Sequence, residues 1–172
     1  MIGIIGQGFV GNAVYQKFKK YYEVLTYDID ESKSNNDKNW VYHQEYIFLC
    51  LPTPMNKDGS CNTDILEKEL SELDLYADNH EIDKTIIIKS TIPPGTTERW
   101  NEKYNSLNII FNPEFLTEAN AVSDYENQDR IILGGPRPTS TQVKTIFSKV
   151  FPNARIIKTN STYAEMVKYL TN

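Results

Sequence analysis

The sequence predicts an α/β domain whose sheet is doubly wound and mostly parallel, with helices on both faces. Apolar runs alternate with helical patterns from one end of the 172 residues to the other, which is typical of this class. Several runs are rich in Ile and Val without a polar residue at every second position. Parallel strands covered on both faces have this composition. The first run also leads directly into a glycine-rich turn.

The expected strands are the short apolar runs Ile2–Ile5, Glu23–Tyr27, Tyr46–Leu51, Thr85–Lys89, Asn108–Phe111, Arg130–Leu133 and Ala154–Ile157. The expected helices are Phe9–Tyr21, Thr63–Asn79, Thr96–Tyr104, Thr139–Val150 and Ser161–Thr171. The segment Ile29–Glu45 is too short and too polar for an ordinary helical crossover. We expect a loop or a short helix there, with little to cover the sheet.

The glycine-rich turn has the pattern G-x-G-x-x-G at Gly6, Gly8 and Gly11. It follows a strand and opens a helix, and Asp28 closes the next strand about 20 residues further on, as in a Rossmann-like dinucleotide site. Gly6 would form the tight turn, Gly8 would let a pyrophosphate approach, and Gly11 would let the helix pack on the sheet. The Asp28 carboxylate would accept ribose hydroxyls and repel a 2′-phosphate, so NAD is favoured over NADP.

Composition excludes several classes of protein. The net charge of −5 and the 40% hydrophobic content fit an ordinary globular chain and give no sign of a nucleic-acid or membrane partner. No apolar run reaches the ~20 residues of a membrane span, and the N-terminus reads as a strand and not as a signal peptide. Two cysteines, Cys50 and Cys61, make no disulfide framework. We therefore expect a single cytoplasmic domain over residues 1–172, without a metal site.

Hydroxyl groups follow two neighbouring strands. Cys50-Leu-Pro-Thr-Pro54 places Thr53 between two prolines, and Ser90-Thr-Ile-Pro-Pro-Gly95 brings Ser90 and Thr91 to the end of another strand. Ligands bind at the carboxyl ends of strands in such sheets. Pro52, Thr53, Ser90 and Thr91 are therefore candidates for the cofactor crevice, although rigid loops without a ligand have the same composition.

The last predicted helix is amphipathic. Tyr163, Met166, Val167 and Leu170 recur at helical spacing, which predicts that this stripe packs inward. Glu165, Lys168 and Asn172 fall on another face, and Lys168 and Asn172 project in the same direction because they are four residues apart. An exposed solvated face is the alternative for these polar residues.

One further motif carries a resemblance to a known family. Asn112-Pro-Glu-Phe-Leu-Thr-Glu118 resembles the N-P-E-F-L-x-E signature of the UDP-glucose/GDP-mannose dehydrogenases. The other motifs agree in order and spacing: G-x-G-F-V-G, Asp28 to Lys33, Leu-Pro-Thr-Pro, Ser-Thr-Ile-Pro-Pro-Gly-Thr-Thr, Asp129-Arg-Ile-Ile132 and Ala164-Glu-x-x-Lys168-Tyr-x-x-Asn172. Together they cover the whole chain, and they resemble the family's N-terminal NAD-binding domain.

The resemblance implies a chemistry and a set of roles. The family oxidises the C6 alcohol of a nucleotide sugar to a carboxylate and reduces two NAD+, through a cysteine thiohemiacetal and thioester. The catalytic residues implied are Thr91, Glu114, Lys168 and Asn172, with Thr91 and Glu114 holding the hydrolytic water and Lys168 and Asn172 stabilising oxyanions. Cofactor contacts implied by the glycine motif and by the resemblance come from Gly6, Gly8, Phe9, Val10, Gly11, Asp28, Lys33, Pro52, Thr53, Ser90, Thr91 and Glu118. The sugar side is implied to include Glu114, Phe115, Leu116, Glu118, Lys168 and Asn172.

Two departures from the family matter. The family's catalytic cysteine and sugar-nucleotide domain belong to a C-terminal half that has no counterpart in this chain, and neither Cys50 nor Cys61 lies in a matching context. The Ile29–Glu45 segment is also shorter than usual. The chain would thus be a cofactor domain with an incomplete active site. It would be a minimal homologue that binds NAD without turnover, a piece of a split enzyme completed by a partner chain, or a fragment of a longer protein. A two-electron hydroxy-acid dehydrogenase is a further alternative. The apolar stripe of the last helix would favour self-association or a partner chain.

Overall fold

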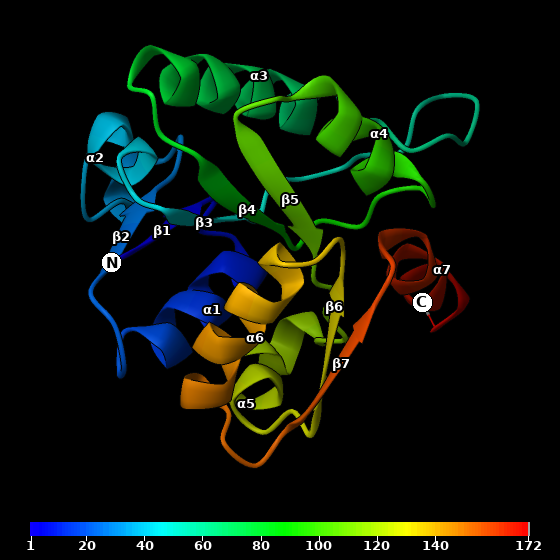
Figure 1. Ribbon diagram of the computed structural model, residues 1–172. Coiled ribbons are helices and arrows are strands. Elements are labelled where there is room, and N and C mark those ends of the chain that lie inside the picture. The colour runs from blue at the N-terminus through cyan, green and yellow to red at the C-terminus, as the bar shows by residue number, and fades with distance from the viewer. Residues whose placement is uncertain (172) are drawn as a thin grey trace.

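A seven-stranded sheet forms the centre of the computed structural model, which describes residues 1–171 (Figure 1). The strands lie in the order β2-β1-β3-β4-β5-β6-β7, and every neighbouring pair is parallel except β5 and β6. The predicted doubly wound, mostly parallel sheet is confirmed. The strands are β1 (Ile2–Ile5), β2 (Val24–Tyr27), β3 (Tyr46–Leu49), β4 (Lys84–Ile88), β5 (Leu107–Phe111), β6 (Arg130–Gly134) and β7 (Arg155–Thr159).

Helices cover both faces of this sheet (Figure 1). One hydrophobic core joins α2, α3, α4 and α7 to one face, and a second core joins α1, α5 and α6 to the other. Within residues 1–171, no helix is both long enough and apolar enough to cross a bilayer. The helices are α1 (Phe9–Phe18), α2 (Lys38–Tyr42), α3 (Asp64–Asn79), α4 (Thr96–Lys103), α5 (Ala121–Glu126), α6 (Thr139–Val150) and α7 (Ser161–Thr171). Sequence patterns missed α5 and the 3₁₀ turn Glu118–Asn120 that precedes it.

The two cores explain why the strand sequences do not alternate. Ile2 and Ile4 of β1 enter the core beneath α1, whereas Ile5 enters the core on the opposite face. Successive side chains of a strand point to opposite faces, and here both faces are buried. Every residue of β1 and of β4 is consequently buried.

The short crossover between β2 and β3 forms a 3₁₀ turn at Glu31–Lys33 followed by α2, as the prediction of a loop or short helix allowed. The Asp37 carboxylate accepts a hydrogen bond from the Trp40 amide and caps α2. Val41 and Tyr42 are buried against β1 and β2. One turn and a half of helix therefore covers this part of the sheet better than the sequence suggested.

The connection of β1 to its neighbours positions the ligand site. β1 pairs with β2 on one side and with β3 on the other, so the crossovers leaving β1 and β2 run in opposite directions. Ligands in open α/β sheets bind outside the carboxyl ends of the strands at such a point. The glycine turn Gly6–Gly8 and the start of α1 lie there.

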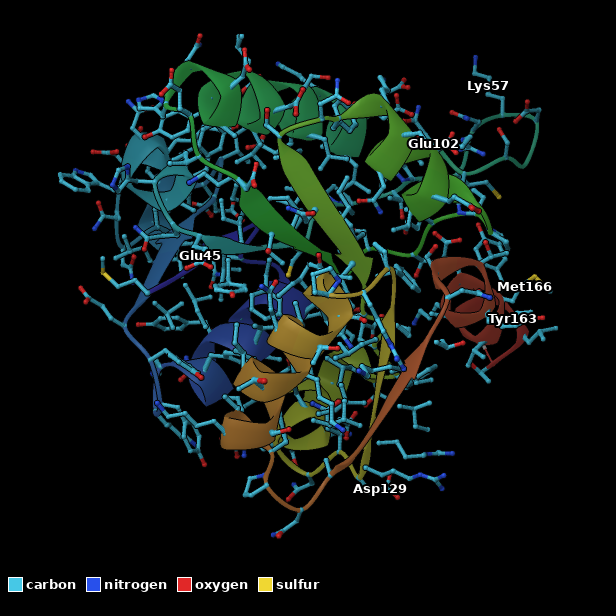
Figure 2. All side chains as sticks on the ribbon, viewed as in Figure 1. Glu45, Lys57, Glu102, Asp129, Tyr163 and Met166 are labelled. Carbon is cyan, nitrogen blue, oxygen red and sulfur yellow. The ribbon has the colours of Figure 1, made fainter. Side chains whose placement is uncertain are left out.

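The predicted orientation of the last helix is wrong. Tyr163, Met166 and Leu170 are 65%, 41% and 78% exposed, whereas Glu165 and Lys168 are 0% and 4% exposed. Figure 2 shows Tyr163 and Met166 on the outer surface of α7. Buried charges are tolerated where partners satisfy them, and both residues have such partners: the start of α4 for Glu165 and Glu114 for Lys168.

Candidate cofactor site

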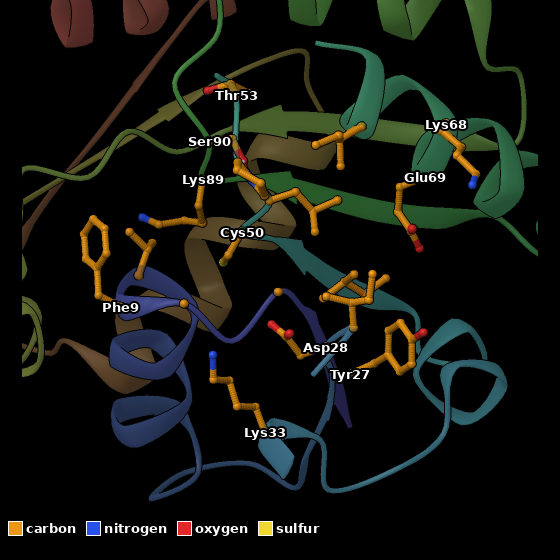
Figure 3. A pocket seen from close by; sticks show the side chains of 18 of the residues that line it. Phe9, Tyr27, Asp28, Lys33, Cys50, Thr53, Lys68, Glu69, Lys89 and Ser90 are labelled. Carbon is orange, nitrogen blue, oxygen red and sulfur yellow. The ribbon is translucent and has the colours of Figure 1, made fainter. Parts of the chain in front are cut away.

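A cavity of about 900 Å³ opens at the carboxyl ends of β1 to β4 (Figure 3). It combines apolar walls with a few polar groups, as small-molecule sites generally do. Eleven of the residues that the sequence singled out line it: Gly6, Gly8, Phe9, Val10, Asp28, Lys33, Pro52, Thr53, Ser90, Thr91 and Glu114.

The glycine turn is built as the sequence predicted. Gly6 has φ +92°, a conformation that side chains rarely adopt. A Cβ on Gly11 would lie 1.8 Å from the carbonyl oxygen of Gly6, so α1 packs against the turn only because Gly11 lacks one. A Cβ on Gly8, by contrast, would meet nothing within 4 Å. The space over Gly8 is free for a ligand, next to the first amides of α1, which have no intrahelical acceptor and carry the positive end of the helix dipole.

Asp28 is held in place from two directions. Its Oδ2 accepts the Gln7 amide at 2.5 Å, and its Oδ1 accepts the Asp30 amide at 2.9 Å. The carboxylate is thus tied to the glycine turn and still has lone pairs for ribose hydroxyls. Lys33 belongs to the following 3₁₀ turn, and its Nζ lies 3.3 Å from Asp30 Oδ2. Lys33 and Asp28 both line the cavity.

The hydroxyl groups join the two loops that border the cavity. Thr53 Oγ1 donates to the Thr91 carbonyl at 2.8 Å, and Ser90 Oγ donates to the Leu51 carbonyl at 2.6 Å. These bonds connect the ends of β3 and β4. Each hydroxyl proton is therefore used within the protein, and its oxygen remains available as an acceptor.

Glu114, which lines the cavity, forms a buried ion pair with Lys168. Lys168 Nζ lies 2.8 Å from Glu114 Oε1 and 2.7 Å from the carbonyl oxygen of the same residue. The two side chains are only 5% and 10% exposed. The Leu116 amide donates to Glu114 Oε2 at 2.8 Å, so both carboxylate oxygens have donors. The structure thus brings together two of the four residues predicted to be catalytic, from segments 54 positions apart.

Other predicted residues lie outside the cavity wall. Phe115 is 48% exposed with its ring 5.7 Å from Lys168 Nζ, and Leu116 packs on the core beneath α1. Glu118 is exposed at the start of a 3₁₀ turn and does not line the cavity. Asn172 lies outside the described residues.

Neither cysteine has the surroundings of a nucleophile. Burial raises the pKa of the Cys50 thiol to about 12; Lys89 opposes this shift, and the nearby Glu114 carboxylate contributes to it. The thiolate is the reactive form, so Cys50 is inert near neutral pH. Cys61 Sγ lies 3.7 Å from the Thr91 carbonyl oxygen, to which it donates.

Sequence reasoning missed two features of the cavity. Lys89 lines it although the residue is only 2% exposed, and the only local signal was a lysine directly after a run of isoleucines. Lys38 bridges Glu69 at 3.0 Å and Glu72 at 2.7 Å, at the same end as Tyr27. No sequence spacing indicated that α2 and α3 would meet there.

Fold and cavity together define a dinucleotide-binding domain, because the open Gly8, the free amides of α1 and the anchored Asp28 fit a pyrophosphate and a ribose. Residues 32–153 match the model of the UDP-glucose/GDP-mannose dehydrogenase family, NAD binding domain. The chain belongs to this family, and the cofactor of this domain is NAD.

Individual relatives agree with this assignment. A UDP-glucose 6-dehydrogenase of Campylobacter jejuni is 31% identical over 99% of this chain and 51% of its own length. The putative UDP-glucose 6-dehydrogenase YtcA of Bacillus subtilis is 34% identical over 82% of this chain and 34% of its own length. A UDP-glucose dehydrogenase structure from Pyrobaculum islandicum superimposes with a TM-score of 0.83 at 21% identity, over 99% of this chain and 48% of that one. The chain therefore spans about half or less of the length of these relatives.

Proposed function

We propose that this chain is the cofactor half of a nucleotide-sugar dehydrogenase that oxidises a C6 alcohol to a carboxylate. UDP-glucose or a similar nucleotide sugar would be the substrate, as in the named relatives. The observation that carries the proposal is the buried Lys168–Glu114 pair, whose Glu114 lines the same cavity as Asp28.

This chain's own residues would do three things in the reaction. The glycine turn, the start of α1 and Asp28 would bind and orient NAD, which supplies the hydride acceptor when bound. Glu114 would accept a proton or hold the attacking water together with Thr91. The ammonium of Lys168 would stabilise negative charge that develops on the sugar oxygen.

A nucleophile would have to come from a further segment or from a partner chain. Within the described residues, Cys50 has a pKa of about 12, and the Cys61 thiol donates to the Thr91 carbonyl. This observation also favours a second candidate function, an NAD-binding module without turnover of its own. The two candidates differ in whether a nucleotide sugar is ever oxidised.

Calorimetric titration of the purified chain tests the proposal. NAD+ is titrated first, and UDP-glucose or GDP-mannose is then titrated in the presence of saturating NAD+. We expect NAD+ to bind with a Kd between roughly 1 μM and 1 mM, that is about −8 to −4 kcal/mol, and no sugar-nucleotide heat from this chain alone. An absence of NAD+ binding at millimolar concentration would refute the proposal.

A turnover assay then distinguishes the two candidate functions. A protein carrying the second half of the Campylobacter jejuni relative is added in trans to this chain with NAD+ and UDP-glucose. Formation of NADH that requires both polypeptides and is lost in Lys168→Met supports the dehydrogenase. Tight binding of NAD+ without NADH formation under any of these conditions supports the binding module.

A further inference from the structure

A buried ammonium group lies at one end of the cofactor cavity. Lys89 directly follows β4, is 2% exposed, and lines the cavity wall. Figure 3 shows Lys89 next to Ser90 and well separated from Tyr27, which lies at the other end of the pocket. None of the reaction roles proposed above involves the Lys89 ammonium.

A hydrogen bond fixes the position of the Lys89 ammonium and does not use all of its N–H donors. Its Nζ donates to Asn112 Oδ1 at 2.8 Å, while Asn112 Nδ2 donates to the Ile132 carbonyl at 2.8 Å and so fixes the amide orientation. The ring centroid of Tyr125 lies 5.3 Å from the same Nζ. An ammonium has three N–H donors, and among residues 1–171 Asn112 supplies its only hydrogen-bond acceptor.

Charged and titratable groups approach Lys89 from four elements. They are Cys50 at the end of β3, Glu114 after β5, Tyr125 of α5 and Lys168 of α7. Burial lowers the pKa of Lys89 to about 8. Cys50 and Glu114 oppose this shift, and Lys168 adds to it. Lys89 is therefore mostly charged at pH 7 and mostly neutral at pH 9.5.

The positions of Asp28 and Gly8 indicate which end of the dinucleotide would lie beside Lys89. Asp28 would hold the adenosine ribose and Gly8 the pyrophosphate, so the nicotinamide must extend toward the ends of β4 and β5, where Lys89, Thr91 and Glu114 line the wall. The oxidised ring carries a positive charge and the reduced ring carries none. Like charges repel strongly where water is excluded.

We propose that Lys89 makes the site select the reduced cofactor, because its ammonium disfavours the cationic ring of NAD+ and tolerates the neutral ring of NADH. The inference rests on the proposed cofactor binding and adds a specificity-determining residue to it. Tighter binding of NADH than of NAD+ raises the reduction potential of the bound pair, which favours oxidation of an alcohol.

The ratio of the two dissociation constants, Kd for NAD+ over Kd for NADH, tests the inference. It is measured by calorimetry on the intact chain at pH 7.0, 8.0, 9.0 and 9.5. We expect the ratio of the unmodified protein to fall by about three- to tenfold over this range, since Lys89 loses its charge. In Lys89→Met the ratio should be lower at pH 7 by a similar factor and independent of pH.

Lys84→Met is the matched control. Lys84 lies at the opposite end of the same strand, is 1% exposed, and its pKa is also lowered to about 8 by burial. It does not line the cavity, so its loss should leave the ratio and its pH dependence as in the unmodified chain.

Two results would overturn the inference: a folded Lys89→Met protein that keeps the ratio and its pH dependence, or an unmodified protein whose ratio does not change between pH 7 and 9.5. The second measurement needs no variant and so remains decisive if Lys89→Met fails to fold. A failure of both cofactor forms to bind would instead refute the proposed function.

Discussion

Glu165 of α7 caps the start of α4: its two carboxylate oxygens accept the amides of Gly95 at 2.5 Å and Thr97 at 2.8 Å. Gly95 itself has no side chain to cap the helix. The carboxylate satisfies orphan amides and complements the helix dipole. It also fixes the rotation of α7, so that Lys168, three residues further on, points to Glu114 and not to solvent.

The Lys168–Glu114 pair should contribute strongly to stability. Lys168→Met leaves the Glu114 carboxylate buried without its cation, and we expect a loss of about 3–5 kcal/mol in the free energy of unfolding. Urea denaturation measures it. The control is Lys103→Met, which breaks a pair with Glu67 whose side chains are 53% and 38% exposed and should cost at most about 1 kcal/mol. Equal losses of unfolding free energy in the two variants would contradict the conclusion that burial makes the Lys168–Glu114 pair the more important one.

The two glycines Gly8 and Gly11 should respond differently to alanine. Gly8→Ala meets open space, so thermal unfolding should change little, while NAD+ affinity drops about tenfold or more because the methyl group occupies the pyrophosphate position. Gly11→Ala forces a contact with the Gly6 carbonyl and should destabilise the fold by about 2–4 kcal/mol. A Gly8→Ala protein with unchanged NAD+ affinity would show that the phosphates bind elsewhere.

Asp28→Ala should weaken NAD+ binding by about 1–3 kcal/mol and reduce the preference for NAD+ over NADP+, because the charge that repels a 2′-phosphate is removed. Titration with both nucleotides measures the change. Asp30→Ala is the companion variant, since Asp30 is exposed and does not line the cavity, and its preference should stay as it was. If Asp28→Ala keeps the same preference for NAD+ over NADP+, Asp28 does not bind the adenosine ribose.

Cys50 should react slowly in the folded protein. A pKa of about 12 leaves roughly one thiol in ten thousand as thiolate at pH 8, against a substantial fraction for an unfolded cysteine of pKa ~8.5. In a Cys61→Ser background, which isolates Cys50, iodoacetamide labelling followed by mass spectrometry should be at least ~100-fold slower than in urea. The Cys61→Ser change should leave NAD+ affinity as it was. Comparable labelling rates would mean that the thiol is not covered.

Lys84 should make stability depend on alkaline pH. Burial lowers its pKa from 10.5 to about 8, so between pH 8 and 10.5 the unfolded chain binds more protons than the folded one. Stability contributed by this group therefore rises with pH across that window and is lowest below pH 8. Relative to Lys84→Met, the unmodified chain should gain up to about 3 kcal/mol between pH 7.5 and 10.5. A constant difference between the two proteins in urea titrations would contradict the shift.

Much of this protein could be predicted from local patterns. Short stretches of sequence were enough to predict the strands, the five longer helices and the glycine turn with Asp28. Periodicity and glycine sterics act over only a few residues. The short α5 has no such pattern, and it was missed. The cavity-lining positions Thr53, Ser90 and Thr91 followed from a general rule on strand ends.

The sequence by itself determined the sheet, the cofactor turn and the family to which the chain belongs. Only the tertiary structure decided the orientation of α7, the pairing of Lys168 with Glu114 and the burial of Lys89. Hydrophobic periodicity assigned the apolar stripe of α7 to the core, yet Glu165 and Lys168 occupy the inner face. Their partners lie 54 to 70 positions away along the chain, and a buried charge is favourable only where such partners meet it.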